Sequence, residues 1–393
     1  GLTDASERAR ILIERSALVW DELADARAAL ADLRDAAQSA PAEPEVIAAL
    51  ARGHARAQQW SESVDAWERV VTALERFVAA QEHPWHAQAV RLWRESLLAQ
   101  ARVYGTNVPD PARAASVLEP LLERDPGDRE AVALLARASL AAGDTRRARD
   151  LYSMLSRDGK PAERAYALLE LAEVARTALR DVAAAHSAAG EAFALAIVDP
   201  AVVPMLEAHY ARTEDWGAFG TLGDEALTNA SGLPVPAVHS TSEIPGELAL
   251  RLAVSRAFAE RLGALDASER HLRAAVERFP RSFAPQLALA RSLMGANDHA
   301  ALRAFRAAAE LDPTDPRAHR GLAELSARSR LPACAALSAS AAALLGEVHP
   351  TLIEALARAP RRAPMSGSLL PDDALALLCG PTRARAARAV LSL

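Results

Sequence analysis

The chain is poor in the residues that build sheets and disulfide frameworks. Aromatic residues make up only 4% of its 393 residues, and runs of Val and Ile are scarce, which argues against an all-β fold and against a parallel α/β sheet. Two cysteines, Cys334 and Cys379, are too few for a disulfide framework and have no cysteine or histidine partner nearby in the sequence. No apolar run approaches the roughly 18 residues of a membrane-spanning helix, so the sequence predicts no membrane span.

The chain also lacks a strong excess of charge of one sign. It has 45 basic and 51 acidic residues and a formal net charge of −6, so we expect no nucleic acid among its partners. Lys160 is the only lysine, and the bias toward Arg and Ala is typical of a GC-rich bacterial genome. The hydrophobic fraction of 51% consists mostly of Ala and Leu. Because both residues favour helices, the sequence predicts an all-α fold with a sizeable core.

A helical unit recurs along the chain at a fixed spacing. Asp25, Asp110 and Asp181 each precede a stretch with small apolar residues three, four and seven or eight positions later, which is typical of an amphipathic helix with Asp as its N-cap. Another amphipathic segment begins 35 residues after each of these aspartates. The repeating unit is therefore a helical hairpin. Turn signals predict nine hairpins, with turns near residues 25, 59, 110, 144, 181, 215, 264, 297 and 331.

The clearest copy of the repeat runs from Arg129 to Tyr152. It has a large and a small apolar residue on the first helix, a glycine at the turn, and a small and an aromatic residue on the second helix: Leu135, Ala136, Gly143, Ala148 and Tyr152. With this pattern, residues 4–347 resemble the tetratricopeptide repeat family. The resemblance implies a right-handed α-solenoid of helix-turn-helix repeats. A HEAT or armadillo solenoid is the alternative, and the spacing of about 34 residues favours the tetratricopeptide repeat.

One long segment divides the predicted array. Residues 1–227 are expected to form a tetratricopeptide-like array of six hairpins, and residues 228–247, rich in Pro, Gly and Ser, an inserted loop. Residues 248–348 continue with three hairpins. Residues 349–393 form a helical tail, which is either a cap of the solenoid or the start of a truncated domain. Because the chain begins at Gly1 without Met and stops inside a helical pattern, we expect a fragment of a longer protein.

The sequence carries no pattern of a known catalytic or metal site. A nucleophile elbow, an HExxH motif and a Gly-rich phosphate loop are all missing. His83 and His86 have a spacing found in metal ligands, but Pro84 separates them and no third ligand is near. We expect a polar turn there, with Trp85 packed inward. The sequence therefore predicts no catalytic residue, no metal and no cofactor.

Arginine is the residue type that the resemblance places on the concave side of the solenoid. Repeat positions 9 and 13 lie one turn apart on the first helix of each hairpin, which faces the groove in the family. A guanidinium suits carboxylates through its planar fork, so we expect an acidic protein or peptide as the partner. Solvated arginines paired with neighbouring Glu and Asp are the alternative. The candidate partner-binding residues are Arg52, Arg56, Arg137, Arg212, Arg261, Arg291 and Arg328.

Together these features favour a non-enzymatic scaffold that binds a peptide or protein segment on its concave surface. The alternative is the recognition arm of a longer enzyme, or of a secretion or envelope assembly subunit, whose active part lies beyond residue 393. The cytoplasm is the favoured location, and the periplasm is the alternative if an export signal has been removed.

Overall fold

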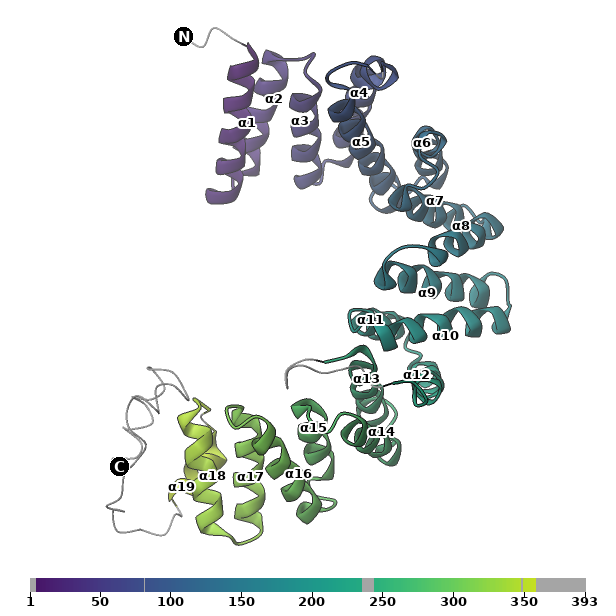
Figure 1. The fold of residues 1–393 in the computed structure, drawn as a ribbon. Coiled ribbons are helices and arrows are strands. Elements are labelled where there is room, and N and C mark those ends of the chain that lie inside the picture. The colour runs from purple at the N-terminus through teal and green to yellow at the C-terminus, as the bar shows by residue number, and fades with distance from the viewer. Residues whose placement is uncertain (1–4, 81, 235–243, 348, 358–393) are drawn as a thin grey trace. The chain divides into compact units, whose positions relative to one another are not determined.

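The chain folds into helices joined by short turns, and it divides into two compact units, residues 1–188 and residues 189–393 (Figure 1). The residues that this computed structural model describes are 5–80, 82–234, 244–347 and 349–357. Within those ranges there are nineteen helices and no strand, which confirms the predicted all-α solenoid. The division of the array by an inserted loop stays a prediction.

Unit 1 contains nine helices and the start of a tenth. Its helices are α1 (Ala5–Glu22), α2 (Ala26–Ser39), α3 (Pro44–Arg56), α4 (Trp60–Ala79), α5 (His86–Thr106), α6 (Pro111–Arg124), α7 (Arg129–Ala141), α8 (Thr145–Arg157), α9 (Pro161–Thr177) and the first residues of α10 (Val182–Val198).

Unit 2 begins within α10. Its further helices are α11 (Val202–Thr213), α12 (Trp216–Ala230), α13 (Gly246–Glu260), α14 (Leu265–Arg278), α15 (Phe283–Leu293), α16 (Asp298–Leu311), α17 (Pro316–Arg328), α18 (Pro332–Leu344) and α19 (Pro350–Ala357). The predicted helical tail begins with α19, and the rest of it, residues 358–393, lies outside the described residues.

The nine predicted hairpins are present, and each pairs an odd-numbered first helix with the even-numbered second helix that follows it. A residue with left-handed backbone geometry stands in the turn of eight of them. Three of these residues are glycines, and the other five, with φ between 52° and 59°, are not: Ala24, Gln58, Gly143, Arg180, Glu214, Gly263, Gly295 and Arg330. In these eight turns the left-handed residue ends the first helix abruptly, so the chain reverses within a few residues.

An aspartate often follows the left-handed residue and caps the second helix. The Asp25 carboxylate accepts hydrogen bonds from the backbone N–H of Arg27 and Ala28. Asp110, Asp144 and Asp215 cap α6, α8 and α12 in the same way, and Asp181 accepts from the N–H of Ala184 in α10. These contacts satisfy amide groups that the first turn of a helix leaves without a partner, and they confirm the predicted caps.

Buried clusters in each unit reach from one hairpin into the next and contain many small side chains. In the repeat around α7 and α8, Leu135 and Tyr152 are buried together with Ala136 and Ala148, and both alanines have no exposed surface. Val132, Ala136, Tyr152 and Leu155 of this hairpin pack with residues of α9, the first helix of the next hairpin. A single hairpin could not bury these faces by itself, so neighbouring repeats stabilise one another.

A buried ion cluster holds the start of α13 in unit 2. The Glu247 carboxylate pairs with Arg251 at 2.9 Å and with Arg278 at 2.6 Å, and the side chains of Glu247 and Arg251 are almost wholly buried. Arg278 also donates to the carbonyl oxygens of Ala230, the last residue of α12, and of Leu233 beyond it. Because a buried carboxylate is stable only with its cations in place, the cluster fixes the two ends of the chain segment between α12 and α13.

A buried histidine lies beside this cluster. His271 of α14 stacks on the ring of Phe258 with a centroid distance of 5.5 Å, and its Nε2 lies 3.1 Å from a carboxylate oxygen of Asp224. Burial lowers the pKa of His271 below its ordinary value of 6.5, and the positive charges of Arg251 and Arg270 lower it further, although Asp224 opposes both effects. His271 is therefore neutral in the folded chain at pH 7.

We predict that Ala148→Leu destabilises the chain by roughly 1–3 kcal/mol, because three extra carbon atoms must enter a contact where Ala148 has no exposed surface. Urea unfolding followed by circular dichroism measures the change. Ala141→Leu, at the end of α7 where the side chain is exposed, is the control and should leave the midpoint unchanged. An unchanged midpoint for Ala148→Leu would show that α8 does not pack closely there.

Glu214→Gly should stabilise the chain by about 0.5–1 kcal/mol. Glu214 has φ of 56°, a geometry that strains residues with a β-carbon, and glycine adopts it without strain even though it adds entropy to the unfolded chain. Glu214→Ala keeps the β-carbon and should give no gain. A gain of equal size from both variants would mean that the Glu214 side chain, rather than the backbone geometry, is unfavourable.

The lowered pKa of His271 predicts a loss of stability in mild acid. Below pH 6.5 the unfolded chain takes up a proton on His271 that the folded chain resists, so stability falls as the pH falls toward the folded pKa. Urea midpoints of the parent and of His271→Gln, measured between pH 7.5 and 5, give the contribution of this residue by difference. Parallel curves for the two proteins would contradict the prediction.

Candidate functional site

The first helices of neighbouring hairpins contact one another directly. In unit 1, α1 packs against α3 and α5 against α7, and in unit 2 α11, α13, α15 and α17 form a series of such contacts. Successive second helices have no comparable contact among α2, α4, α6 and α8 or among α12, α14, α16 and α18. The first helices therefore make the inner, more crowded layer of each unit. We call the exposed side of this layer the first-helix face.

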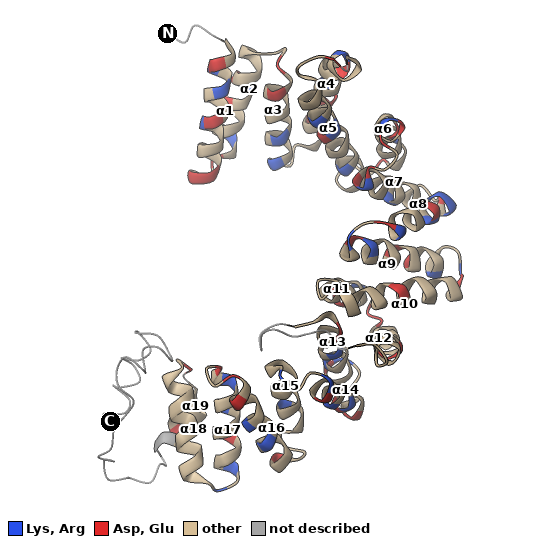
Figure 2. Cartoon of the chain, in the orientation of Figure 1, with Lys and Arg blue, Asp and Glu red and all other residues tan. Residues whose placement is uncertain are grey.

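The seven predicted arginines are all exposed, and they belong to the first-helix layer. Arg52 and Arg56 lie on α3, and Arg137 lies on α7, all in unit 1. In unit 2 the set comprises Arg212 on α11, Arg261 directly after α13, Arg291 on α15 and Arg328 on α17. Acidic residues occur beside basic ones along most of these helices (Figure 2). Whether the arginines bind a partner stays a prediction.

In unit 1 the predicted arginines already have partners within the chain. Arg52 forms a two-pronged contact with Glu95 of α5, with N–O distances of 2.8 and 2.9 Å, and its guanidinium lies 5.5 Å from the ring centroid of Trp67. Arg56 pairs with Asp21 of α1 at 2.7 Å and stacks on Trp20. Exposed ion pairs of this kind contribute only about 0–1 kcal/mol, but an acidic ligand would have to displace them.

Arg137 also has a partner within the chain, and this partner is the neutral side chain of Tyr166. Its Nη2 donates to the Tyr166 hydroxyl of α9 at 2.8 Å, and its Nε donates to the same oxygen at 3.2 Å. The guanidinium also lies 5.4 Å from the centroid of the Tyr166 ring. All three contacts reach from one first helix to the next, so these arginines link neighbouring hairpins of unit 1.

In unit 2 the groups around the predicted arginines differ from those in unit 1. Arg291 has no ion pair with any described residue, and burial, followed by the positive charges of Arg317 and Arg320 on α17, lowers its pKa. Arg317 is bound to Asp315 and Arg320 to Glu347. Arg261 lies 5.2 Å from the ring centroid of Trp216 without a carboxylate partner among the described residues, and Arg212 donates to His209 at 3.3 Å. The cationic group around Arg291 was not predicted as a cluster.

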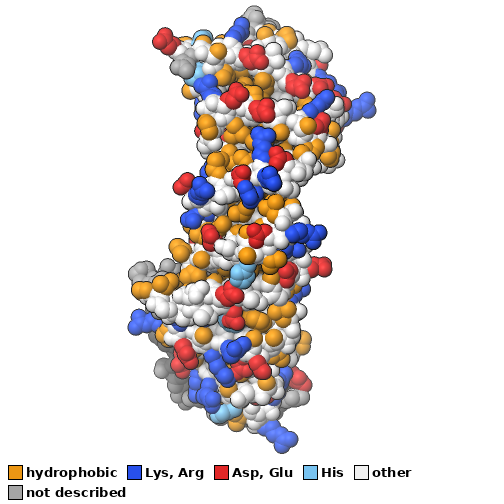
Figure 3. All heavy atoms as spheres, turned by 90° about the vertical axis from the view of Figure 1, so that its right-hand side faces the viewer, with side chains coloured by type: hydrophobic (Ala, Val, Ile, Leu, Met, Phe, Trp, Pro, Cys, Tyr) orange, Lys and Arg blue, Asp and Glu red, His pale blue; other side chains and the backbone are white. Residues whose placement is uncertain are grey.

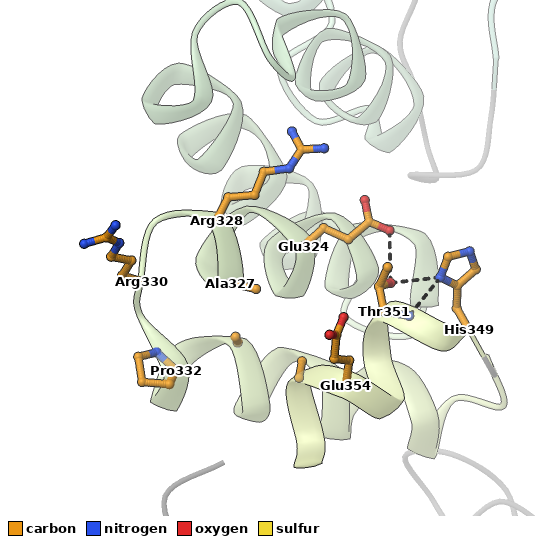
Figure 4. A pocket seen from close by; sticks show the side chains of 10 residues that line it. Glu324, Ala327, Arg328, Arg330, Pro332, His349, Thr351 and Glu354 are labelled. Carbon is orange, nitrogen blue, oxygen red and sulfur yellow. Dashed lines mark hydrogen bonds between the residues drawn. The ribbon is translucent and has the colours of Figure 1, made fainter. Parts of the chain in front are cut away.

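A cavity of about 780 Å³ lies between α17, α18 and α19. Arg328 borders it, but its guanidinium points away from the hollow, whereas Glu354 points into it (Figure 4). Thr351 Oγ1 lies 2.8 Å from His349 Nδ1 and 3.5 Å from Glu324. Although hydroxyl, imidazole and carboxylate are adjacent, His349 also accepts the Thr351 N–H. The group is therefore a local turn that begins α19.

The structure corrects one expectation from the sequence. Trp85 does not pack inward, because 60% of its surface is exposed. The turn between α4 and α5 instead places His83 against the ring of Phe77, with 5.0 Å between centroids. The sequence predicted a turn at this place but not which of its side chains would pack against α4.

The described part of the chain has neither a cluster of metal-ligating side chains nor a helix that could span a membrane. No group of three or more His, Cys, Asp or Glu side chains there could hold a metal ion. None of the described helices combines the length and the apolar character needed to cross a bilayer. On the surface that Figure 3 shows, acidic and basic side chains are interspersed with apolar ones and no field of one sign dominates.

A family described as tetratricopeptide repeat matches residues 110–172. No curated protein sequence matches the chain.

Several solved structures are similar to this chain. YrrB, described as a TPR protein with an unusual peptide-binding site, is 16% identical to it, with a TM-score of 0.32. The match covers 61% of this chain and 97% of the YrrB chain. A tetratricopeptide repeat protein from Parabacteroides merdae is 13% identical with a TM-score of 0.29, over 90% of this chain and 98% of its own. Yeast Tom70 is 15% identical with a TM-score of 0.30, over 90% of this chain and 88% of its own.

Proposed function

We propose that this tetratricopeptide-repeat protein is a non-enzymatic scaffold that holds an acidic segment of another protein on its first-helix face. The observation that carries the proposal is the layer of first helices, which offers an extended surface of exposed side chains in each unit. Such a surface suits a long, weakly structured ligand. It contains no preorganised reactive group among the described residues, which supports binding rather than catalysis.

The arginines of unit 2 are the favoured contacts for that segment. Arg291 has no carboxylate of its own within ion-pair distance among the described residues, and the positive charges of Arg317 and Arg320 act on it more strongly than the opposing charges of Asp315 and Glu347. A carboxylate supplied by a partner would pair with Arg291, because Arg317 and Arg320 are already bound to Asp315 and Glu347. Arg52, Arg56 and Arg137 are weaker candidates, because each is already held by a group of the chain itself.

The net charge of the chain sets the expected strength of binding. At −6 the chain as a whole repels an acidic ligand, so attraction comes only from the local arrangement of arginines. We therefore propose weak association that salt screens easily, because exposed charges lose most of their interaction beyond about 10 Å at 0.1 M salt. The same balance of charge disfavours nucleic acid as a partner.

The test compares two pairs of substitutions in unit 2. A fluorescein-labelled peptide of about 16 residues containing Glu, Leu and Ala is titrated with the parent chain and with Arg291→Gln/Arg328→Gln. We expect the double variant to bind about three- to tenfold more weakly at low salt, because two cations of the first-helix face are lost, and we expect binding by the parent to weaken in 0.5 M salt.

The matched control is Arg303→Gln/Arg306→Gln on α16, a second helix of the same unit whose two arginines are exposed. It removes the same charge but leaves the first-helix face intact, so it should bind the peptide as the parent does. Equal weakening by both pairs would show that only net charge matters. If the parent does not bind the peptide at low salt, the proposed acidic partner is wrong.

A further inference from the structure

The turn between α4 and α5 closes a small cavity at one end of hairpins 2 and 3. These two helices are the longest of unit 1, at 20 and 21 residues, and the chain runs between them through His83, Pro84 and Trp85. Because helices alternate in direction, the end of α4 and the start of α5 lie at the same end of the stack as the start of α3 (Figure 1). The cavity lies among these three helix ends.

The cavity has a volume of about 260 Å³ and mostly apolar walls. Pro44 of α3, Leu74 and Phe77 of α4, Trp85 of the turn and Leu92 of α5 line it. Liquid water occupies about 30 Å³ per molecule, so the space accommodates one large side chain and is smaller than the usual pocket for a whole small molecule. An indole ring exposed beside such a hollow is a feature of surfaces that bind peptides.

Contacts within the turn fix the shape of this cavity. The backbone N–H of Trp85 donates to His83 Nδ1 at 3.1 Å, and the His83 ring meets the edge of Phe77. A ring nitrogen of His86 bonds to the carbonyl oxygen of Phe77 at 3.0 Å. The walls are therefore held by the chain itself, and a ligand would enter a site that is already formed, which reduces the entropy lost on binding.

The rim of the cavity carries one carboxylate and one cation. Glu45, which accepts a hydrogen bond from Gln88, lines the opening, and a second carboxylate, Glu82, directly precedes the aromatic part of the turn in the sequence without lining the cavity. Glu45 and Glu82 are both exposed, and neither forms an ion pair with a described residue. The one cation at the rim, Arg76, lies over the Phe77 ring at 4.6 Å. The exposed indole of Trp85 adds a π-face that attracts cations.

We propose that this cavity binds an extended segment of a partner protein that inserts one leucine-sized aliphatic side chain and places an Arg or Lys directly after it. The aliphatic group fills the hollow between Leu74, Phe77 and Leu92. The cation lies over Trp85 and pairs with Glu45. The site is at the end of the hairpins rather than on the first-helix face, and it selects for positive charge, so it stands independently of the acidic ligand proposed above.

The test uses capped tripeptides and fluorine NMR of the full chain labelled with 5-fluorotryptophan. The chain contains six tryptophans, and the signal lost in Trp85→Phe identifies Trp85. We expect Ac-Ala-Leu-Arg-NH2 to shift the Trp85 signal in a saturable manner while the other five signals stay in place. Ac-Ala-Leu-Glu-NH2 and Ac-Ala-Ala-Arg-NH2 should bind at least fivefold more weakly, since each lacks one of the two required groups.

Variants then test the individual residues by calorimetric titration with Ac-Ala-Leu-Arg-NH2. Trp85→Ala should weaken binding at least tenfold and Glu45→Gln about threefold. Leu18→Ala, which removes another side chain that is 62% exposed, should bind as the parent does. Both side chains at the site are exposed, so we expect the variants to fold, and their circular dichroism spectra check this.

Three results would overturn the proposal. These are the absence of a saturable Trp85 shift, equal binding of the Arg and Glu peptides, and binding by Trp85→Ala as tight as that of the parent. None of them bears on the first-helix face, because each result is measured at Trp85 or with a Trp85 variant, at the end of the hairpins. Conversely, loss of the acidic-peptide interaction in Arg291→Gln/Arg328→Gln leaves the cavity unaffected.

Discussion

The stack depends on helices that approach closely enough for alanine to fill the space between them. Ala51, Ala136, Ala148 and Ala308 have no exposed surface, and each belongs to a different helix. With so few aromatic residues in the chain, large side chains cannot fill wide gaps, so the backbones themselves must lie near one another. The regular hairpin length, the abrupt turns and the dependence of each repeat on its neighbours all follow from this close approach.

The features that the sequence predicted well are local ones. Asp25, Asp110 and Asp181 mark helix starts because an N-cap needs only the next three residues. A left-handed residue stands directly before Asp25 and Asp181, and at both places, Ala24 and Arg180, the chain adopts this geometry without glycine. A search for glycine alone would have missed those turns, whereas spacing and capping found them, and so the number of hairpins could be derived from the sequence.

The features that the sequence did not predict depend on distant partners. Arg52 meets Glu95 and Arg56 meets Asp21 across 43 and 35 residues, and no local pattern indicates which carboxylate reaches which guanidinium. Trp85 was expected inside, because a large aromatic in a helical chain is usually buried. Its exposure depends on how the turn is held, by His83 against the Phe77 ring and by His86 on the Phe77 carbonyl oxygen, and no local pattern indicates these contacts.

The buried cluster of Glu247, Arg251 and Arg278 has a consequence for how this chain can change over time. It holds both ends of the segment between α12 and α13 within one unit, and Gly246 lies so close to the carbonyl of Ala196 that a β-carbon there would be only 2.3 Å from it. With both ends held, lengthening the segment adds little free energy, since loop-closure entropy grows only slowly with length. Evolution, or a protein engineer, could therefore graft an entire passenger domain at this point while the repeats on either side keep their register.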